Sequence, residues 1–199
     1  MKKAFRIVLA GLFLGVIGLG WRWPLLAYCM FLNVLLGIIL CRVKGGRYAC
    51  GNTCPRGAFY GLLPRFHKGR IPDKLRRIPI SFPFMALVLG GLIWWVGPND
   101  LRSWGVVFYG LLVTTFIVGI AGALSYRVYF WCALCPMGKI YRWVGRRVTG
   151  PTVGTGCVSC GQCDAVCPMS LPVRSGNNPD CLQCGACIEK CPKGILRLK

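Results

Sequence analysis

Two stretches near the C-terminal end of this sequence share one cysteine spacing: CVSCGQCDAVCP at residues 157–168 and CLQCGACIEKCP at residues 181–192. In each stretch, pairs of residues separate the first three cysteines, three residues precede the fourth cysteine, and proline follows it. Three thiolates at this spacing can wrap a tight loop around one inorganic cluster, and the fourth, delivered after a short helical turn, points toward a neighbouring cluster. The fold of this region is therefore predicted to depend on two clusters.

Bacterial ferredoxins use this pattern for two [4Fe–4S] clusters, and the fourth cysteine of each run ligates the cluster of the other run. Zinc sites combine CxxC pairs rather than triplets with a CxxxCP continuation, and disulfides do not suit a reducing cytoplasm. The sequence therefore predicts two [4Fe–4S] clusters with crossed ligand sets. The predicted ligands are Cys157, Cys160, Cys163 and Cys191 for the first cluster, and Cys181, Cys184, Cys187 and Cys167 for the second.

The tail that carries these runs, residues 151–199, is predicted to be a small α+β domain similar to a bacterial 2[4Fe–4S] ferredoxin. It is too short to build a normal apolar core, so we expect the clusters to stabilise it and the cluster-free tail to be unstable. Gly161 and Gly185 lie inside the loops, where the backbone must approach the cluster. The acids of the tail are expected to be solvated or to cap helices: Asp164, Asp180 and Glu189.

Upstream of the tail, the sequence has the character of a membrane protein. Hydrophobic residues make up 55% of the chain and charged residues 15%, whereas soluble domains carry about 25% charged residues. Each of four apolar stretches is long enough to cross a hydrocarbon layer about 30 Å thick. We therefore predict an all-α membrane domain over residues 1–150, with four transmembrane helices at Ala4–Trp21, Trp23–Cys41, Ile78–Gly97 and Trp104–Leu124.

The distribution of charge predicts the orientation of these spans. The chain carries 25 Lys and Arg against 5 Asp and Glu. Basic residues gather in segments 42–78 and 125–156, whereas the two other connections hold Arg22 and Arg102. Cytoplasmic loops of membrane proteins are enriched in Lys and Arg. We therefore predict a multi-pass protein of the cytoplasmic (inner) membrane with both termini and the tail in the cytoplasm, and membrane topology, not nucleic-acid binding, explains the net charge of +20.

Two details of the apolar stretches allow alternatives. The basic start of the chain would also suit a cleaved signal peptide, but no small-x-small cleavage site follows the first stretch. Tryptophans lie near several span ends, as is typical of the interfacial aromatic belt. Trp94 and Trp95 could instead line a quinone pocket, although the belt is the simpler interpretation.

Four further cysteines follow a second pattern, which we call the cysteine knuckles: CGNTCPRG at residues 50–57 and CALCPMG at residues 132–138. An offset of 81 residues superposes one on the other. The membrane part is therefore predicted to consist of two hairpin repeats, each ending in a knuckle on the cytoplasmic side. The aligned pairs are Cys54 with Cys135, Pro55 with Pro136, Gly57 with Gly138, and Tyr60 with Tyr141.

We expect the knuckle cysteines to converge at the membrane face and to bind a third iron–sulfur cluster or another metal. Redox-active thiol pairs and a purely structural role are the alternatives. The residues concerned are Cys50, Cys54, Cys132 and Cys135. Cys29 and Cys41 are interpreted as small apolar residues of a span. His67 is the single histidine, which excludes histidine-rich zinc sites.

The chain resembles the NapH/NosR/CcoG-type polytopic membrane ferredoxins. The resemblance rests on the four apolar stretches, the knuckles at 50–55 and 132–136, and the double cysteine run at 157–192. It implies a protein that moves electrons between the quinone pool, or cytoplasmic donors, and partner redox proteins. The NosR branch also carries an outer flavin domain with a covalent-FMN threonine, and nothing in this sequence matches that domain.

These features favour a membrane-anchored electron-transfer subunit of an oxidoreductase complex similar to a quinol dehydrogenase, with other redox subunits and quinone as partners and no catalytic residue of its own. The apolar stretches contain no Asp, Glu or His, the usual proton carriers inside membranes, so a quinone site would lie at a subunit interface. A copper reductase or cofactor-assembly factor similar to the CcoG branch is the alternative, because soft thiolates suit Cu(I). A redox sensor or scaffold with structural clusters is a third hypothesis.

Overall fold

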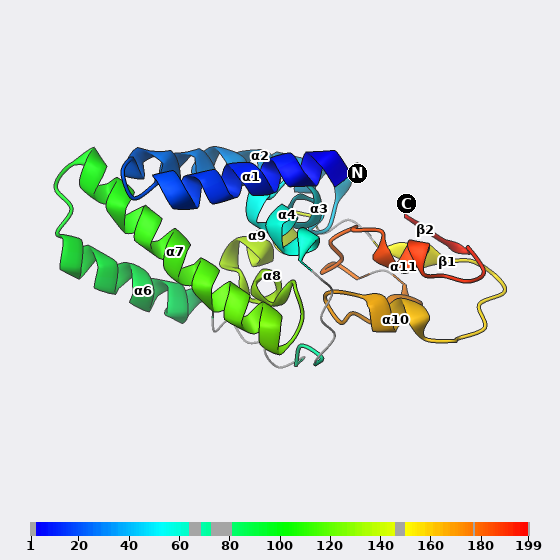
Figure 1. Cartoon of the computed structure of the whole chain (residues 1–199). Helices are drawn as coiled ribbons and strands as arrows, with labels where there is room; N and C mark the ends of the chain where they lie inside the picture. Colours follow the sequence, from blue (N-terminus) through cyan, green and yellow to red (C-terminus); the bar gives the residue numbers. More distant parts are fainter. Residues whose placement is uncertain (1–2, 64–68, 73–80, 146–149, 177, 199) are drawn as a thin grey trace.

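The structure is a computed structural model that describes residues 3–63, 69–72, 81–145, 150–176 and 178–198. His67 and the start of the predicted third span, residues 78–80, lie outside the described residues. Helices form most of the described chain, and a smaller part with two short strands lies at one end (Figure 1). This arrangement agrees with a helical region followed by a small α+β tail.

Four apolar helices correspond to the four apolar stretches: α1 (Lys3–Leu19), α2 (Cys29–Lys44), α6 (Ser81–Val96) and α7 (Leu101–Ser125). A 3₁₀ turn, η1 (Pro24–Tyr28), leads into α2. Two continuous segments, Pro24–Lys44 and Leu101–Ser125, are long and apolar enough to cross a membrane, whereas the other two apolar helices are shorter than 18 residues. By length and composition, the helices suggest a membrane association, and the four crossings stay a prediction.

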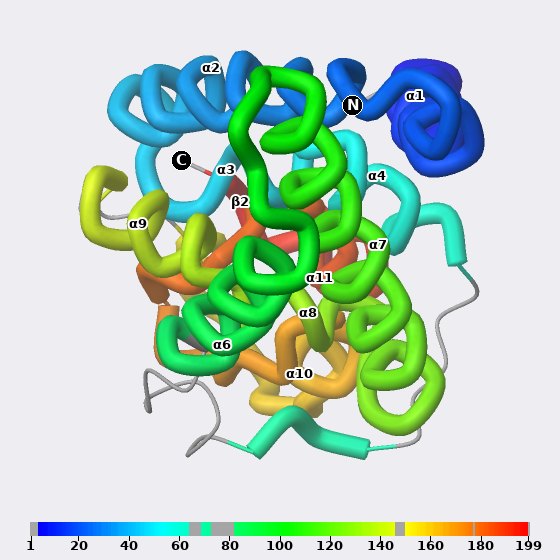
Figure 2. The backbone as a smooth tube through the Cα atoms, turned by 90° about the vertical axis from the view of Figure 1, so that its left-hand side faces the viewer, coloured from blue at the N-terminus to red at the C-terminus, as the bar shows by residue number. Residues whose placement is uncertain are grey.

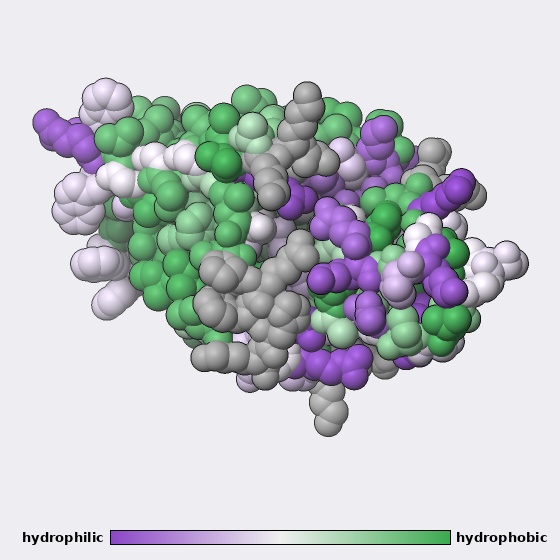
Figure 3. All heavy atoms as spheres, turned by 45° about the vertical axis from the view of Figure 1, so that its right-hand side comes forward, coloured by the Kyte–Doolittle hydropathy of each residue, from purple (hydrophilic) through white to green (hydrophobic). Residues whose placement is uncertain are grey.

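The surface of the helical part is apolar over a wide area. Figure 3 shows hydrophobic residues covering the helices and hydrophilic residues gathering on the tail. The side chains of Trp94 and Trp95 are 89% and 81% exposed, and among the described residues neither lines the cavity between the helices. A large exposed apolar surface is typical of contact with lipid or an apolar partner. The outward tryptophans favour the interfacial belt over a quinone pocket.

The two knuckles share one local structure. A short helix precedes the second cysteine of each knuckle, and proline then occupies the first turn of the next helix, where its missing N–H costs nothing. The first knuckle consists of α3 (Tyr48–Asn52) and α4 (Pro55–Leu62), and the second of α8 (Phe130–Leu134) and α9 (Pro136–Val144). The same order of elements therefore recurs at the predicted offset.

Each knuckle packs on the second long helix of the other hairpin. The buried ring of Tyr60 lies against Gly119 of α7, where an added Cβ would collide with its hydroxyl. The buried ring of Tyr141 lies against Gly37 of α2, and its hydroxyl donates to the carbonyl oxygen of Val34 at 3.2 Å. The two hairpins are therefore interlocked through their knuckles.

The tail has the predicted α+β character. Strand β1 (Pro151–Val153) pairs antiparallel with β2 (Leu196–Leu198), and Pro151 lies opposite Leu198. Helix α10 (Gln162–Val166) contacts α11 (Ala186–Glu189), and a short turn, η2 (Val173–Ser175), lies between them in the sequence. Buried tail residues such as Met169 and Leu182 belong to the same apolar cluster as Tyr60 of the first knuckle. The tail therefore shares a core with the knuckles.

Both chain termini lie at the end of the molecule that carries the tail, and the connections α1–α2 and α6–α7 lie at the opposite end (Figure 1). Figure 2 views the molecule from that opposite end, with α6 and α7 in front and the knuckle helices behind them. The basic segments that follow α2 and α7 therefore begin on the tail side. The crossing of a membrane and the orientation of the helices across it stay predictions.

Candidate iron–sulfur sites

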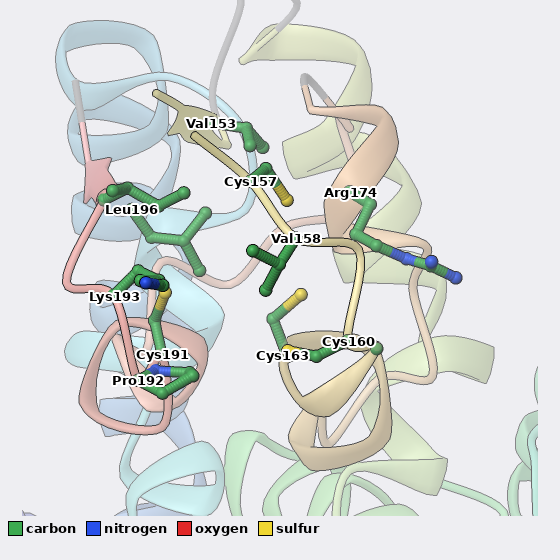
Figure 4. Close-up of a pocket in the computed structure, with 12 residues that line it drawn as sticks. Val153, Cys157, Val158, Cys160, Cys163, Arg174, Cys191, Pro192, Lys193 and Leu196 are labelled. Carbon is green, nitrogen blue, oxygen red and sulfur yellow. The ribbon is translucent and has the colours of Figure 1, made fainter. Parts of the chain in front are cut away.

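Four cysteines from both runs of the tail line one cavity. Cys157, Cys160 and Cys163 come from the first run and Cys191 from the second. Figure 4 shows the two segments on opposite sides of this cavity, with Val158 between them. The rest of the lining is mostly apolar and includes Val153 and Leu196. These four cysteines are the predicted ligands of the first cluster.

The other four cysteines of the tail line a second cavity. Cys181, Cys184 and Cys187 come from the second run, and Cys167 comes from the first. The structure therefore groups the eight cysteines across the two runs, four to a cavity, in the sets that crossed ligation requires.

The two loops use left-handed backbone at equivalent positions. Gly161 and Gly185 have φ values of 76° and 79°, and two residues earlier Ser159 and Gln183 each have a φ of 52°. A left-handed residue turns the chain sharply, and glycine adopts it without steric cost. Backbone N–H groups also point at sulfur, because Gln183 donates to Cys181 Sγ at 3.4 Å. Such hydrogen bonds adjust the potential of an iron–sulfur cluster.

The two cavities differ in how far water reaches their thiols. Burial raises the pKa of the Cys187 thiol to about 12 and that of the Cys181 thiol to about 11. Cys157 and Cys160 are exposed, and backbone N–H groups, that of Ile195 first, lower the pKa of the Cys191 thiol. Even a thiol with a pKa far above neutrality loses its proton when a metal binds its sulfur. The second cavity is therefore the more enclosed one.

A family model described as a 4Fe-4S dicluster domain matches residues 146–199. Searches of curated proteins and of solved structures gave no match. The tail is an iron–sulfur, ferredoxin-like domain. We call residues 146–199 the dicluster domain from here on. The match confirms iron–sulfur chemistry at this end of the chain and does not reach the knuckles or the long helices, so the wider family resemblance stays an inference.

The knuckle cysteines also meet at one cavity, of about 300 Å³, which we call the knuckle site. Its cysteines come from both knuckles: Cys50, Cys54, Cys132 and Cys135. The long helices supply apolar walls, among them Met30 and Val34 of α2, Met85 of α6, and Phe108 and Leu112 of α7. The structure therefore brings together the four residues that the sequence offered as a third site.

Two thiols of the knuckle site, those of Cys50 and Cys132, are buried and strongly desolvated. Burial raises the pKa of the Cys50 thiol to about 12. Burial, together with repulsion from Cys50 and Cys54, raises the pKa of the Cys132 thiol well above its ordinary value. The free thiols of Cys50 and Cys132 are therefore neutral at physiological pH, and a bound metal centre would both deprotonate and neutralise them.

The spacing of the thiols bears on the kind of centre that fits. In the part of the chain that the structure describes, no three His, Cys, Asp or Glu side chains lie close enough to bind one metal ion together. This also holds for the cysteines of the dicluster domain. A [4Fe–4S] cluster takes one thiolate at each of its four irons, so its thiolates lie further apart than those around a single ion. The four thiols that line the knuckle site match the number of ligands that such a cluster takes.

Arg56 is a buried charge in the knuckle site that sequence reasoning missed. Its side chain is 9% exposed and lines the cavity, and its Nη1 donates to Thr115 Oγ1 at 3.0 Å. The guanidinium lies 4.7 Å from the ring centroid of Trp131, and its Nε and Nη2 have no hydrogen-bond partner within the described residues. One signal was available in the sequence. At the offset of 81 residues, Arg56 of the first knuckle aligns with the uncharged Met137 of the second, so this charge breaks the repeat.

The Cys181 loop of the dicluster domain docks on the first knuckle. Asn52 Nδ2 donates to the carbonyl oxygen of Leu182 at 3.4 Å, and a Cβ added at Gly51 would collide with that carbonyl. Asp180 pairs with Arg47 and Arg142 at 3.5 and 3.1 Å. Asp180 is therefore an anchor of this contact, not the solvated acid or helix cap that the sequence suggested.

Proposed function

We propose that this chain is a membrane-anchored iron–sulfur subunit that passes electrons between a quinone-linked site in the membrane and partner redox subunits. The observation that carries the proposal is the succession of three cavities, each lined by four cysteines. The knuckle site opens among apolar helices, the second cavity belongs to the loop docked on the knuckles, and the first cavity has exposed cysteines. This succession suits stepwise electron transfer between the long helices and the exposed end of the tail.

The ligand sets follow the cavities. We propose that Cys157, Cys160, Cys163 and Cys191 hold one [4Fe–4S] cluster and that Cys167, Cys181, Cys184 and Cys187 hold a second. A third cluster at the knuckle site would use Cys50, Cys54, Cys132 and Cys135. Bound clusters of this type take up and release single electrons.

The quinone link is supported by the lining of the knuckle site. Apolar residues of α2, α6 and α7 surround a cavity of about 300 Å³, a volume within the range of small-molecule sites. Arg56 offers unpartnered N–H donors there, and a quinone carbonyl oxygen would accept a hydrogen bond from them. The knuckles supply the thiols for the cluster, so the cluster and the quinone would meet at the boundary between the long helices and the knuckles.

A test uses the full-length protein in lipid nanodiscs. After reduction by dithionite and its removal, one added quinone should take two electrons from reduced clusters and two protons from water, forming quinol and leaving two clusters oxidised. Arg56→Met, which copies Met137 of the other knuckle, should slow this reoxidation about tenfold through loss of charged hydrogen bonds. Arg22→Gln, an exposed change, is the control. Clusters that stay reduced in the wild type would show the quinone link to be wrong.

We further propose that the four apolar stretches cross the inner membrane with both termini in the cytoplasm. Fluorescent protein fused after Lys199 should fluoresce, and alkaline phosphatase fused there should be inactive, because the phosphatase needs an oxidising compartment. Phosphatase inserted at Asn99, between α6 and α7, should be active. An active phosphatase after Lys199 would reverse the orientation and place the dicluster domain outside.

A copper reductase or assembly factor is the second candidate, because the polar lining of the knuckle site is rich in soft thiols. In that case Cu(II) would oxidise the reduced nanodisc protein, and Cu(I) would replace iron at the knuckles.

A further inference from the structure

Arg47 lies where three parts of the chain meet: the first knuckle, the second knuckle and the Cys181 loop. Its side chain is 2% exposed. Its Nη2 donates to the carbonyl oxygen of Cys132, and its backbone N–H donates to the carbonyl oxygen of Cys181 at 3.3 Å. An added Cβ at Gly138 would collide with its guanidinium, so the second knuckle leaves room for this side chain.

The positive charge of Arg47 is only partly balanced by its acidic neighbour. Asp180 Oδ1 lies 3.5 Å from Arg47 Nη1. Asp180 Oδ2 makes the shorter ion pair, 3.1 Å, with Nη1 of the exposed Arg142. Arg47 Nε is buried and has no hydrogen-bond partner in the described part of the chain. A buried charge needs an opposite charge and hydrogen-bond acceptors. The structure therefore leaves positive charge and a free donor near the knuckle site.

Sulfur atoms are the nearby groups that can meet this need. Cys50, Cys132 and Cys135 all lie within electrostatic reach of the Arg47 guanidinium. Thiolates that hold a cluster are negative and accept N–H···S hydrogen bonds. Neutral thiols would leave Arg47 with only the partial balance that Asp180 provides.

We infer that Arg47 is a positioning residue that stabilises the reduced form of a cluster at the knuckle site and holds the Cys181 loop beside it. This inference rests on the proposed function, because it requires a cluster at the knuckles. A nearby positive charge raises a reduction potential, since the reduced cluster carries one more negative charge. Because of the loop contact, the cluster of Cys181 would be the next centre after the knuckle centre in the electron-transfer chain. One electron would leave one of these two centres, which is oxidised, and enter the other, which is reduced, with no bond or proton changed.

The test is a redox titration of the full-length protein followed by electron paramagnetic resonance. Arg47→Gln should favour the oxidised knuckle centre about tenfold, which is 59 mV for a one-electron couple. Arg47→Lys keeps the charge and loses the planar donor, so a shift of about threefold is expected. Arg22→Gln, which removes a positive charge at an exposed position that does not line the knuckle site, should leave the potential of the knuckle centre unchanged.

The outcomes separate the two proposals. A wild-type protein with only two centres and about eight irons would contradict the third cluster, and with it the inference. Three wild-type centres with an unchanged potential in Arg47→Gln would overturn the role of Arg47 and leave the proposed function standing. Should Arg47→Gln fail to accumulate, Arg47→Met, which also removes the charge, is titrated in its place, and an unchanged potential in that variant would overturn the inference equally.

Discussion

Replacing Cys191 with alanine should remove the cluster of Cys157, Cys160 and Cys163. It should spare the cluster of Cys181, Cys184 and Cys187, although these cysteines are nearer to Cys191 in the sequence. The reason is geometric, because Cys191 lines the cavity of the first run. Loss of one thiolate from a four-thiolate cluster leaves an iron without its ligand. Iron and acid-labile sulfide should each fall by about four per chain, and one resonance signal should disappear.

The identity of the lost cluster is read from matched variants. The spectrum of Cys191→Ala should equal that of Cys160→Ala, and the spectrum of Cys167→Ala should equal that of Cys184→Ala. Cys29→Ala, outside all three cavities as the described residues define them, serves as the control. Ligation run by run is the correct description if Cys191→Ala instead matches Cys184→Ala.

Replacing Cys132 with alanine should abolish the knuckle centre and leave both clusters of the dicluster domain. Cys132 is buried, and its thiol lies beside Cys50 and Cys54 in one cavity. Iron should again fall by about four per chain, while the signals of the other two clusters remain. Iron analysis and resonance spectroscopy of the purified full-length protein measure both effects.

A double variant distinguishes one shared centre from two separate knuckles. If all four cysteines hold one cluster, Cys54→Ala should cause the same loss as Cys132→Ala, and combining the two should remove nothing more. Separate sites would instead give two different losses that add. An unchanged iron content in Cys132→Ala would eliminate the third cluster.

The grouping of cysteines was accessible from sequence because ligand spacing is local chemistry. Three thiols per loop and a fourth after three intervening residues restrict the chain strongly, and the structure places those eight residues in two cavities. The offset between the knuckles likewise reflects a local pattern, helix, cysteine, proline and helix, that short-range sequence determines.

The burial and the partners of the charged residues around the sites could not be predicted from local sequence patterns. Arg47 and Asp180 lie 133 residues apart in the sequence, and Arg56 meets Thr115 across 59 residues. In the sequence, both arginines stand in a basic segment that the positive-inside rule already explains. Only the packing of the knuckles shows that these two side chains are buried.

The ends of the helices also differ from the ends predicted from the apolar stretches. The predicted second span began at Trp23 and ended at Cys41, whereas its first turn is a 3₁₀ helix and α2 continues to Lys44. Pro24 occupies the first turn, where no N–H is needed. At the other end Gly45, with a φ of 78°, terminates the helix, and basic residues suit a helix C-terminus.

The interlocking of the hairpins affects the order of events during synthesis. When the ribosome has released only the first hairpin, Gly119 does not yet exist for Tyr60 to pack on, and the carbonyl group of Cys132 does not yet exist for Arg47. A nascent chain at this stage holds a charge and a ring without their final partners. Any cofactor that requires cysteines of both knuckles can enter only after residue 135 has been made, so loading at the knuckles is necessarily a late step of biogenesis.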